Sequence, residues 1–295
     1  MDLLPDETQD IIKDFIIFKP VTKEDLQKAI KLWCENKYKA LRKYGDISLW
    51  DTSLITDMSR LFFRKQLFNS DISNWDVSNV TNMEQMFHGC DSFLQDLNNW
   101  NVSNVTNMIK IFRRCKNFNQ DLNNWNVSNL TDMTKMFERC RKFNQDLNNW
   151  NVSNVKTMDL MFDGCENFNQ PLSNWNTSNV IYMSYMFDGC KNFNQDLNNW
   201  NVSNVETMNS MFSSCYVFNK PLNNWDVSNV KNMIGMFYKC RNFNHDLSNW
   251  IHYNEHNRIV MFTANSLSDS DDENRDAIKY GEWNWEPNLD DGADY

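Results

Sequence analysis

Residues 100–124 read WNVSNVTNMIKIFRRCKNFNQDLNN, and nearly the same 25-residue unit recurs along most of the chain. A tryptophan opens each unit, without insertion or deletion, at Trp50, Trp75, Trp100, Trp125, Trp150, Trp175, Trp200, Trp225 and Trp250. A fixed period in this range is typical of solenoids, in which each unit stacks only on its neighbours. The repeat therefore predicts a long stacked fold instead of one compact core.

Each unit contains two different hydrophobic patterns. Met108, Ile111, Phe112 and Cys115 are spaced i, i+3, i+4 and i+7, as on one face of a short helix. Residues 100–102 alternate apolar, polar and apolar side chains, which suits a short strand. We therefore expect an α/β solenoid of the leucine-rich-repeat type, with one short parallel strand and one short helix per repeat.

The apolar positions form columns that we expect to be a structural core ladder. Its members are Trp75, Trp100, Trp125, Trp150, Trp175, Trp200, Trp225, Met108, Phe112, Cys115, Phe118 and Leu122. Seven of the eight cysteines also recur at the repeat spacing. Reduced cysteine packs as a small hydrophobe, so we interpret this column as core, with oxidation or metal binding as the alternatives.

Solenoids need atypical units at their ends to cover exposed core. Leu26, Ala29, Ile30 and Trp33 form an amphipathic pattern within residues 21–44, and Thr22 followed by Asp25 is compatible with a helix start. In the last unit, polar Arg258 and Asn265 replace core residues. The predicted divisions are a helical N-terminal cap at 1–49, eight repeats at 50–249, a degenerate capping repeat at 250–265 and an acidic, disordered tail at 266–295.

The net charge of −10 is unevenly distributed. From residue 263 to the end there are ten acids and two bases, whereas residues 1–49 contain nine of each. Residues 50–262 therefore carry a net charge of only −2, which predicts neither nucleic acid nor an anionic membrane as a partner. No signal peptide, lipid-attachment cysteine or long apolar run is present, so we expect an intracellular, cytoplasmic protein, including the cytoplasm of a host cell.

One motif points to metal chemistry. His252, Glu255 and His256 match H-x-x-E-H, an inverted zinc-protease pattern, but they lie in the degenerate last unit without a helical domain around them. We interpret them as an adventitious surface pair. Because the sequence also has no glycine-rich phosphate loop and no nucleophile elbow, we expect no enzyme activity, no catalytic or metal site and no cofactor.

The unit W-[DN]-V-S-N-V-T-x-M-x-x-M-F-x-x-C-x-x-F-N-Q-x-L-x-N resembles the repeat of BspA-like surface proteins and mycoplasma-type lipoproteins, which are grouped with leucine-rich repeats. The resemblance covers residues 50–262. LQKAIKLW at residues 26–33 and YGDISLWDTSLITDMSRLF from Tyr44 onward resemble the module that precedes the repeats in that family. The resemblance implies a structural repeat used for adhesion or protein binding, without enzyme activity.

A second resemblance concerns the first twenty residues. LLPDETQDIIKDFIIF resembles the start of an F-box, with matching positions at Leu4, Pro5, Ile11, Ile12, Phe15 and Ile16. It implies a ubiquitin-ligase adaptor as a partner and a substrate receptor that uses the repeats to select substrates. The alternative is that this segment is only part of the cap.

Sequence variation between units indicates where a specific protein partner would be read. It is concentrated after each Phe and just before each Met. The candidate binding residues are Arg113, Arg114, Glu138, Arg139, Lys156, Tyr182, Tyr185, Glu206, Tyr238 and Lys239. The uniform asparagines of the other half-unit would suit a repetitive ligand such as a glycan or a fibre. Unconstrained surface is the alternative interpretation of the variable positions.

Overall fold

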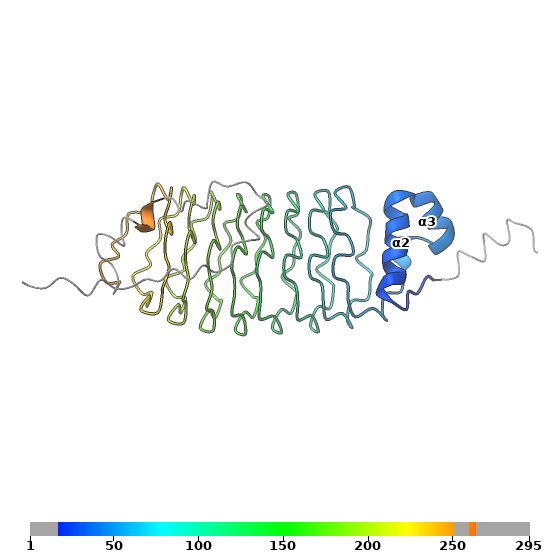
Figure 1. Ribbon diagram of the computed structural model, residues 1–295, viewed down its shortest axis with the longest axis horizontal. Coiled ribbons are helices and arrows are strands. Elements are labelled where there is room, and N and C mark those ends of the chain that lie inside the picture. Colours follow the sequence, from blue (N-terminus) through cyan, green and yellow to red (C-terminus); the bar gives the residue numbers. More distant parts are fainter. Residues whose placement is uncertain (1–16, 251–259, 264–295) are drawn as a thin grey trace, which may run out of the picture.

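The computed structural model describes residues 17–250 and 260–263. Two helices, α2 (Lys23–Glu35) and α3 (Lys37–Tyr44), lie at one end and are followed by a short 3-10 helix, η1 (Ile47–Leu49). Beyond them the units follow one another as a row of similar loops, with residues 260–263 at the opposite end (Figure 1). Among the described residues, no helix is long and apolar enough to cross a membrane.

The helix start predicted at Thr22 is confirmed. The Thr22 side chain accepts a hydrogen bond from the Asp25 N–H, and the Asp25 carboxylate accepts one from the Thr22 N–H, which forms a capping box. The apolar face of α2 is buried, including Leu26 and Trp33. The helical stretch is broken at Asn36, whose side chain caps the start of α3.

Helix α2 covers the open end of the first unit. Trp33 packs edge-on against Trp50, with 5.9 Å between the ring centroids. Phe18 also packs against Trp50, at 5.1 Å. The Nζ of Lys23 donates to the Asp57 carboxylate, which ties the helix to the polar edge of the same unit. The apolar face of α2 therefore buries the core side chains that no preceding repeat would cover.

Successive units are joined by backbone hydrogen bonds. Alternate N–H groups of one unit donate to carbonyls of the next unit along the chain. Between the first two units, these bonds run from Met58 to Asn82, from Arg60 to Glu84, from Phe62 to Met86 and from Arg64 to His88, at 2.7 to 2.9 Å. We call the segments that pair in this way the paired band: residues 59–64, 84–89, 109–114, 134–139, 159–164, 184–189, 209–214 and 234–239.

The paired band is a run of turns at the position where the sequence predicted a short helix. Within residues 50–250, all of which the structure describes, no α-helix is assigned. Lys110 and Arg114 have φ of 60° and 62°, in the left-handed region of backbone conformation. A right-handed helix cannot continue through these two residues. In a helix, the N–H groups would bond within the unit. Here alternate N–H groups face the next unit instead.

The predicted strand at residues 100–102 is also absent from the described repeats. The N–H of Trp100 donates to the Leu97 carbonyl within its own turn. Isolated parallel bridges instead join equivalent residues of successive units, such as Asn82 with Asn107. These bridges lie seven residues after each tryptophan, at the edge of the paired band.

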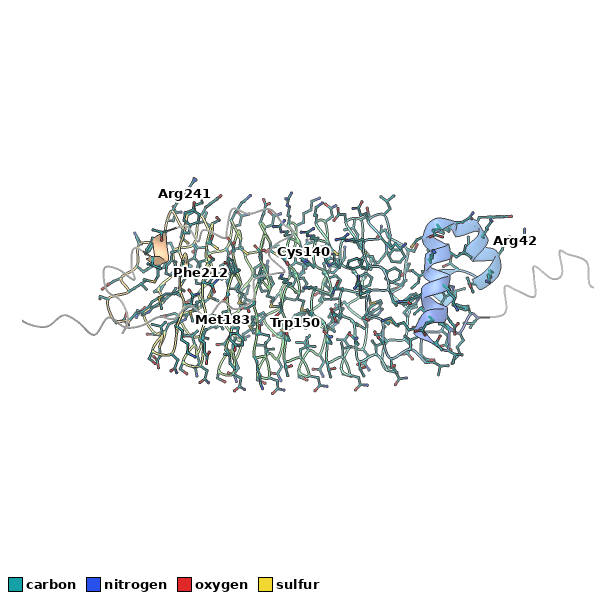
Figure 2. All side chains as sticks on the ribbon, in the orientation of Figure 1. Arg42, Cys140, Trp150, Met183, Phe212 and Arg241 are labelled. Atoms are coloured by element: carbon teal, nitrogen blue, oxygen red, sulfur yellow. The ribbon has the colours of Figure 1, made fainter. Side chains whose placement is uncertain are left out.

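The core consists of continuous columns of identical or similar side chains. Met108, Phe112, Cys115, Phe118 and Leu122 are each 0% exposed. The seven tryptophans of the predicted core ladder are 2–3% exposed. The Phe112 ring stacks between two equivalent rings, with centroid distances of 5.6 Å to Phe87 and 5.8 Å to Phe137. Cys140, Trp150, Met183 and Phe212 lie within the stack, whereas Arg241 projects from its edge (Figure 2).

Candidate functional site

The polar atoms of the core columns are used in holding the units together. The Trp150 indole Nε1 donates to the carbonyl of Leu122, 28 residues earlier, at 3.0 Å. The Cys140 Sγ donates in the same way to the Phe112 carbonyl, also at 3.0 Å. Burial raises the pKa of the buried thiols, to about 12 at Cys240. Among the described residues, no group of His, Cys, Asp and Glu side chains is arranged to hold a metal ion. These columns are therefore structural.

An open groove on the surface crosses four successive units. Its volume is about 590 Å³. Two columns line it, one of asparagines and one of variable residues. The lining residues are Asn129, Asn154, Asn179 and Asn204, with Thr131, Lys156, Ile181 and Glu206. The groove exists only in the stack, because each unit contributes one residue to each column.

The asparagines of the groove are held in fixed orientations. The Nδ2 of Asn154 donates to the Ser128 carbonyl at 2.8 Å, and Asn179 and Asn204 make the equivalent bonds at 2.7 Å. All four groove asparagines are exposed. The bond uses one of the two N–H groups of each amide, and within the described chain no hydrogen bond reaches the Oδ1 atoms of these four residues. The groove therefore presents a row of preset hydrogen-bond acceptors.

The second column has a regular backbone and changing side chains. The N–H of Lys156 donates to the Thr131 carbonyl at 2.8 Å, and Ile181 and Glu206 continue the same ladder, each at 2.8 Å. Lys156 is exposed and has no acidic partner in the part of the chain that the structure describes. Glu206 is partly exposed and is paired with Lys231, with 3.0 Å between Nζ and Oε2. The column thus places a cation, an apolar side chain and an anion on three successive units.

A second and smaller hollow lies on the uniform asparagine face. Its volume is about 340 Å³, and its lining includes Asn198, Asn201 and Asp226. Because its polar side chains are nearly the same in every unit, it can recognise a repeating polar ligand but gives little basis for specific recognition.

The structure divides the predicted binding residues between the groove and the paired band. Lys156 and Glu206 line the groove, and Tyr182 directly follows its Ile181. The others, Arg113, Arg114, Glu138, Arg139, Tyr185, Tyr238 and Lys239, belong to the paired band. The predicted surface is therefore not one continuous site.

Three of the predicted binding residues are not exposed. Arg113, Glu138 and Tyr185 are 5%, 1% and 4% exposed. The reason for the first two is an ion pair between adjacent units, in which the Nε of Arg113 donates to the Glu138 Oε2 at 2.7 Å and Nη2 donates to Oε1 at 3.1 Å. This buried bidentate ion pair joins adjacent units, and its charged groups are therefore not accessible to a ligand.

Sequence reasoning missed most of the groove. Asn129, Asn154, Asn179 and Asn204 were overlooked because they do not vary. Thr131 and Ile181 have the same repeat position as Lys156 and Glu206, two residues before a Met, but were not in the candidate set. The available signal was the pairing of an invariant polar residue with a variable one two positions later, as in Asn154 and Lys156.

Three other predictions lie outside the described residues. They concern the candidate zinc-protease residues His252, Glu255 and His256, the F-box-like positions and the acidic tail.

These features define a class: a tandem-repeat protein, with identical columns inside, a helical cap at one end and an amide-lined groove on its surface. The chain belongs to the family described as Mycoplasma protein of unknown function, DUF285, which matches residues 33–150, 96–191, 120–216 and 172–274. The mycoplasma-type repeat resemblance is thereby confirmed. The matches begin within α2 and give no support to an F-box. A comparison with curated proteins found no match.

Proposed function

We propose that this chain is a non-enzymatic, leucine-rich-repeat-like solenoid scaffold that binds a protein partner along the groove of Asn129 to Glu206. One observation carries the proposal: an open groove crosses four units, with a fixed asparagine and a variable side chain from each. The family match supports the repeat scaffold, because its matched segments overlap one another along the repeats.

The chemistry of the groove suits an extended peptide segment. Four units span roughly 15 Å at the usual spacing of paired chains, which is the length of about four or five extended residues. The Oδ1 atoms of the asparagines can accept hydrogen bonds from peptide N–H groups, which every partner sequence has. Lys156, Ile181 and Glu206 would then select the partner through its side chains. Backbone contacts supply affinity and side-chain contacts supply specificity, as in other modes of extended-peptide binding.

The rigidity of the groove favours binding. The asparagine amides are bonded to the preceding unit, and the variable column follows a continuous backbone ladder. Less conformational entropy is lost on binding when the contact groups are already ordered. A stack of identical units therefore provides a preorganised surface whose specificity changes only at the variable column.

The same residues support a binding role over a catalytic one. Lys156 and Glu206 are two units apart, roughly 10 Å at the spacing of paired chains, which is too far for direct proton exchange. The asparagines between them do not titrate near neutral pH and are held by hydrogen bonds. The groove thus offers recognition groups without an activated nucleophile.

The proposal is tested by changing the variable column of the groove. Lys156→Glu combined with Ile181→Asp should weaken partner capture about tenfold or more, because it reverses one charge and places an acid at the apolar position. The matched control is Lys142→Glu combined with Val217→Asp, which makes the same chemical changes at exposed residues outside the groove. Partners are purified with the full chain and quantified by mass spectrometry. Equal capture by both variants would contradict binding in the groove.

The second candidate function is an F-box-type substrate receptor of a ubiquitin ligase, favoured by LLPDETQDIIKDFIIF at the N-terminus. The full chain is compared with one that starts at Pro20, which keeps the Thr22 capping box. Capture of a ubiquitin-ligase adaptor by the full chain alone would support the receptor. Capture of the same partners by both chains is expected of the scaffold.

A further inference from the structure

The core columns are less completely buried at the C-terminal end of the stack than inside it. Within residues 75–224, every Met, Cys and Phe side chain is 0% exposed. In the following unit, residues 225–249, Met233 and Phe243 are only partly buried, and Cys240 is 6% exposed. The last unit therefore lacks part of the cover that each inner unit receives from the next one.

Two phenylalanine rings form an open aromatic edge at this end. Phe243 and Phe262 both pack against Phe237, with centroid distances of 4.2 and 5.4 Å. Phe262 is 38% exposed, whereas Phe212, at the equivalent position of an inner unit, is buried and stacks on the Phe237 ring at 5.8 Å. Within the described residues, no ring of a further unit stacks on Phe262. We call Phe243 and Phe262 the aromatic edge.

The sequence does not continue the columns beyond this edge. A further unit in the same register would place the next Cys at position 265 and the next Phe at position 268, where the chain has Asn265 and Ser268. The other end of the stack is closed, because α2 packs against Trp50 (Figure 1). The aromatic edge is therefore an apolar surface that needs a cover other than a further repeat.

The C-terminal tail contains one segment that resembles the start of a repeat unit. Residues 283–289 read WNWEPNL, and residues 125–130 read WNVSNL. The two agree in the opening Trp-Asn pair, in an apolar side chain two positions after the first Trp and, after one additional residue, in Asn-Leu. Trp283, Trp285 and Leu289 are large apolar side chains in an otherwise acidic tail. Because such side chains are stabilised by removal from water, this segment is suited to bind an apolar surface.

We propose that residues 283–289 of this same chain bind the aromatic edge and form the C-terminal cap of the stack, with Trp283 and Trp285 over its two rings. Stacked aromatic rings already join each unit to the next. Pro287 fixes its own φ and restricts Glu286 to extended conformations, which lowers the entropy lost on binding. The cap lies apart from the groove and does not depend on the proposed function.

The chain leaves the stack beside this edge and is long enough to return to it. The Phe237 N–H donates to the Met261 carbonyl at 2.9 Å, so residues 260–263 belong to the last layer. Trp283 follows Thr263 by 20 positions, which gives a mean end-to-end distance of roughly 22–27 Å for a flexible chain. The α2 end lies eight units away, roughly 38 Å at the spacing of paired chains. The aromatic edge is thus the nearer end, and tethering gives the segment a high local concentration there.

The first test is photo-cross-linking of the full chain, with a benzophenone amino acid in place of Glu286. This position follows both tryptophans and leaves them unchanged. After irradiation, mass spectrometry should identify links to residues 233–262, which include the aromatic edge. Mixing isotopically light and heavy protein separates links within one molecule from links between two copies. Links to the α2 end, links found only between copies, or no link at all would overturn the proposal.

The second test changes the edge. Phe262→Asp should lower the yield of these cross-links about tenfold, because it removes one of the two rings and places a charge on the apolar surface. Val217→Asp is the matched control, since Val217 is 37% exposed and lies in an inner unit, away from the edge. It should leave the yield within about twofold of that of the unaltered chain, because distant sites act independently. An equal loss in both variants would contradict the proposal.

A third test remains valid if the edge variant disturbs the last unit. Trp283→Ser combined with Trp285→Ser alters no residue of the repeats, and Tyr280→Ser combined with Tyr295→Ser is the control, because it removes aromatic side chains elsewhere in the tail. Without its cap, the last unit should open more often, so its amide hydrogen exchange should become about fivefold faster while that of the central units stays unchanged. Unchanged exchange in the last unit, or equal acceleration in both variants, would overturn the proposal.

Discussion

Each tryptophan both fills the core and donates a hydrogen bond. Trp150 is 2% exposed, and its Nε1 donates to the carbonyl of Leu122, 28 residues earlier. Eight such bonds, from Trp75 to Trp250, each reach a carbonyl 28 residues earlier and so tie successive layers of the stack together. Because the indole provides both apolar area and a donor, neither Phe nor Tyr would replace it without loss.

The two roles of Trp150 can be separated by substitution. Trp150→Phe keeps an aromatic ring and removes one of the two hydrogen bonds that the Leu122 carbonyl accepts, since the Trp125 N–H still donates to it, so we expect a loss of about 0.5–1.5 kcal/mol in unfolding free energy. Trp150→Ala also opens a cavity and should cost about 3–5 kcal/mol. Urea denaturation of both variants measures the difference. A Trp150→Phe variant as stable as the parent chain would show that the hydrogen bond contributes nothing.

The cysteine column should be chemically inert in the folded protein. Cys34 is exposed, whereas Cys90, Cys115, Cys140, Cys165, Cys190, Cys215 and Cys240 are buried. Burial raises the pKa of the column thiols, so they hold little thiolate at neutral pH. A colorimetric disulfide reagent should titrate one thiol in the native protein and all eight after denaturation. Rapid reaction of several thiols in the native state would contradict the buried column.

His88 predicts a loss of stability on mild acidification. Its folded-state pKa is lowered to about 3 from 6.5, so the unfolded chain binds the proton more readily. The free energy of unfolding is highest above pH 6.5, where His88 is neutral in both the folded and the unfolded chain. It falls progressively as the pH drops from 6.5 towards the folded-state pKa of His88. Between about pH 7 and pH 5, the parent chain should lose about 1–2 kcal/mol more than His88→Gln. Denaturant midpoints at both pH values provide the measurement, and parallel losses in the two proteins would contradict it.

At the scale of elements, the start of helix α2 could be predicted from the local sequence. Thr22 and Asp25 form the capping box, and the buried face has the helical spacing of Leu26, Ala29, Ile30 and Trp33. In the run of turns in the repeats, the buried apolar side chains are spaced along the sequence much as they would be on one face of a helix. The feature that separates the two is a positive φ at Lys110 and Arg114. Glycines stand at the equivalent positions of other units, Gly235 for Lys110 and Gly89, Gly164 and Gly189 for Arg114, and they were the available sequence signal.

The capping box can be tested alone. Thr22→Ala removes the side-chain acceptor of the Asp25 N–H and should destabilise α2 by about 1 kcal/mol. Hydrogen exchange at the α2 amides should become about fivefold faster, while amides of the central repeats remain unchanged. Val21→Ala, at an exposed neighbouring residue, is the control and should have no effect. Equal exchange in the two variants would exclude a stabilising role for the box.

At the scale of the whole molecule, stability comes from contacts between successive units of the repeat. The backbone ladder, the tryptophan bonds and the stacked phenylalanines all join a unit to its neighbours. Stability in such an arrangement is close to a sum of unit and interface contributions. The length of the stack is therefore adjustable, provided that the register between units is kept.

Deletion of residues 125–149 removes one unit and leaves every remaining column in register. We expect a folded protein with a denaturant m-value reduced in proportion to the surface lost. Deletion of residues 125–136 would place polar residues in the core columns, and it should abolish cooperative unfolding. Circular dichroism and urea denaturation distinguish the two. Similar behaviour of both deletions would contradict stacking in register.

The sequence by itself determined the repeat period, the side chains that recur as columns and the start of the cap helix, because these depend on spacing along one chain. The tertiary structure alone decided the path of the backbone within each unit, since the direction of the N–H groups depends on acceptors in the next unit. It also decided that Arg113, Glu138 and Tyr185 are buried and that the groove forms. Exposure and concavity are properties of adjacent units together, and no single unit possesses them.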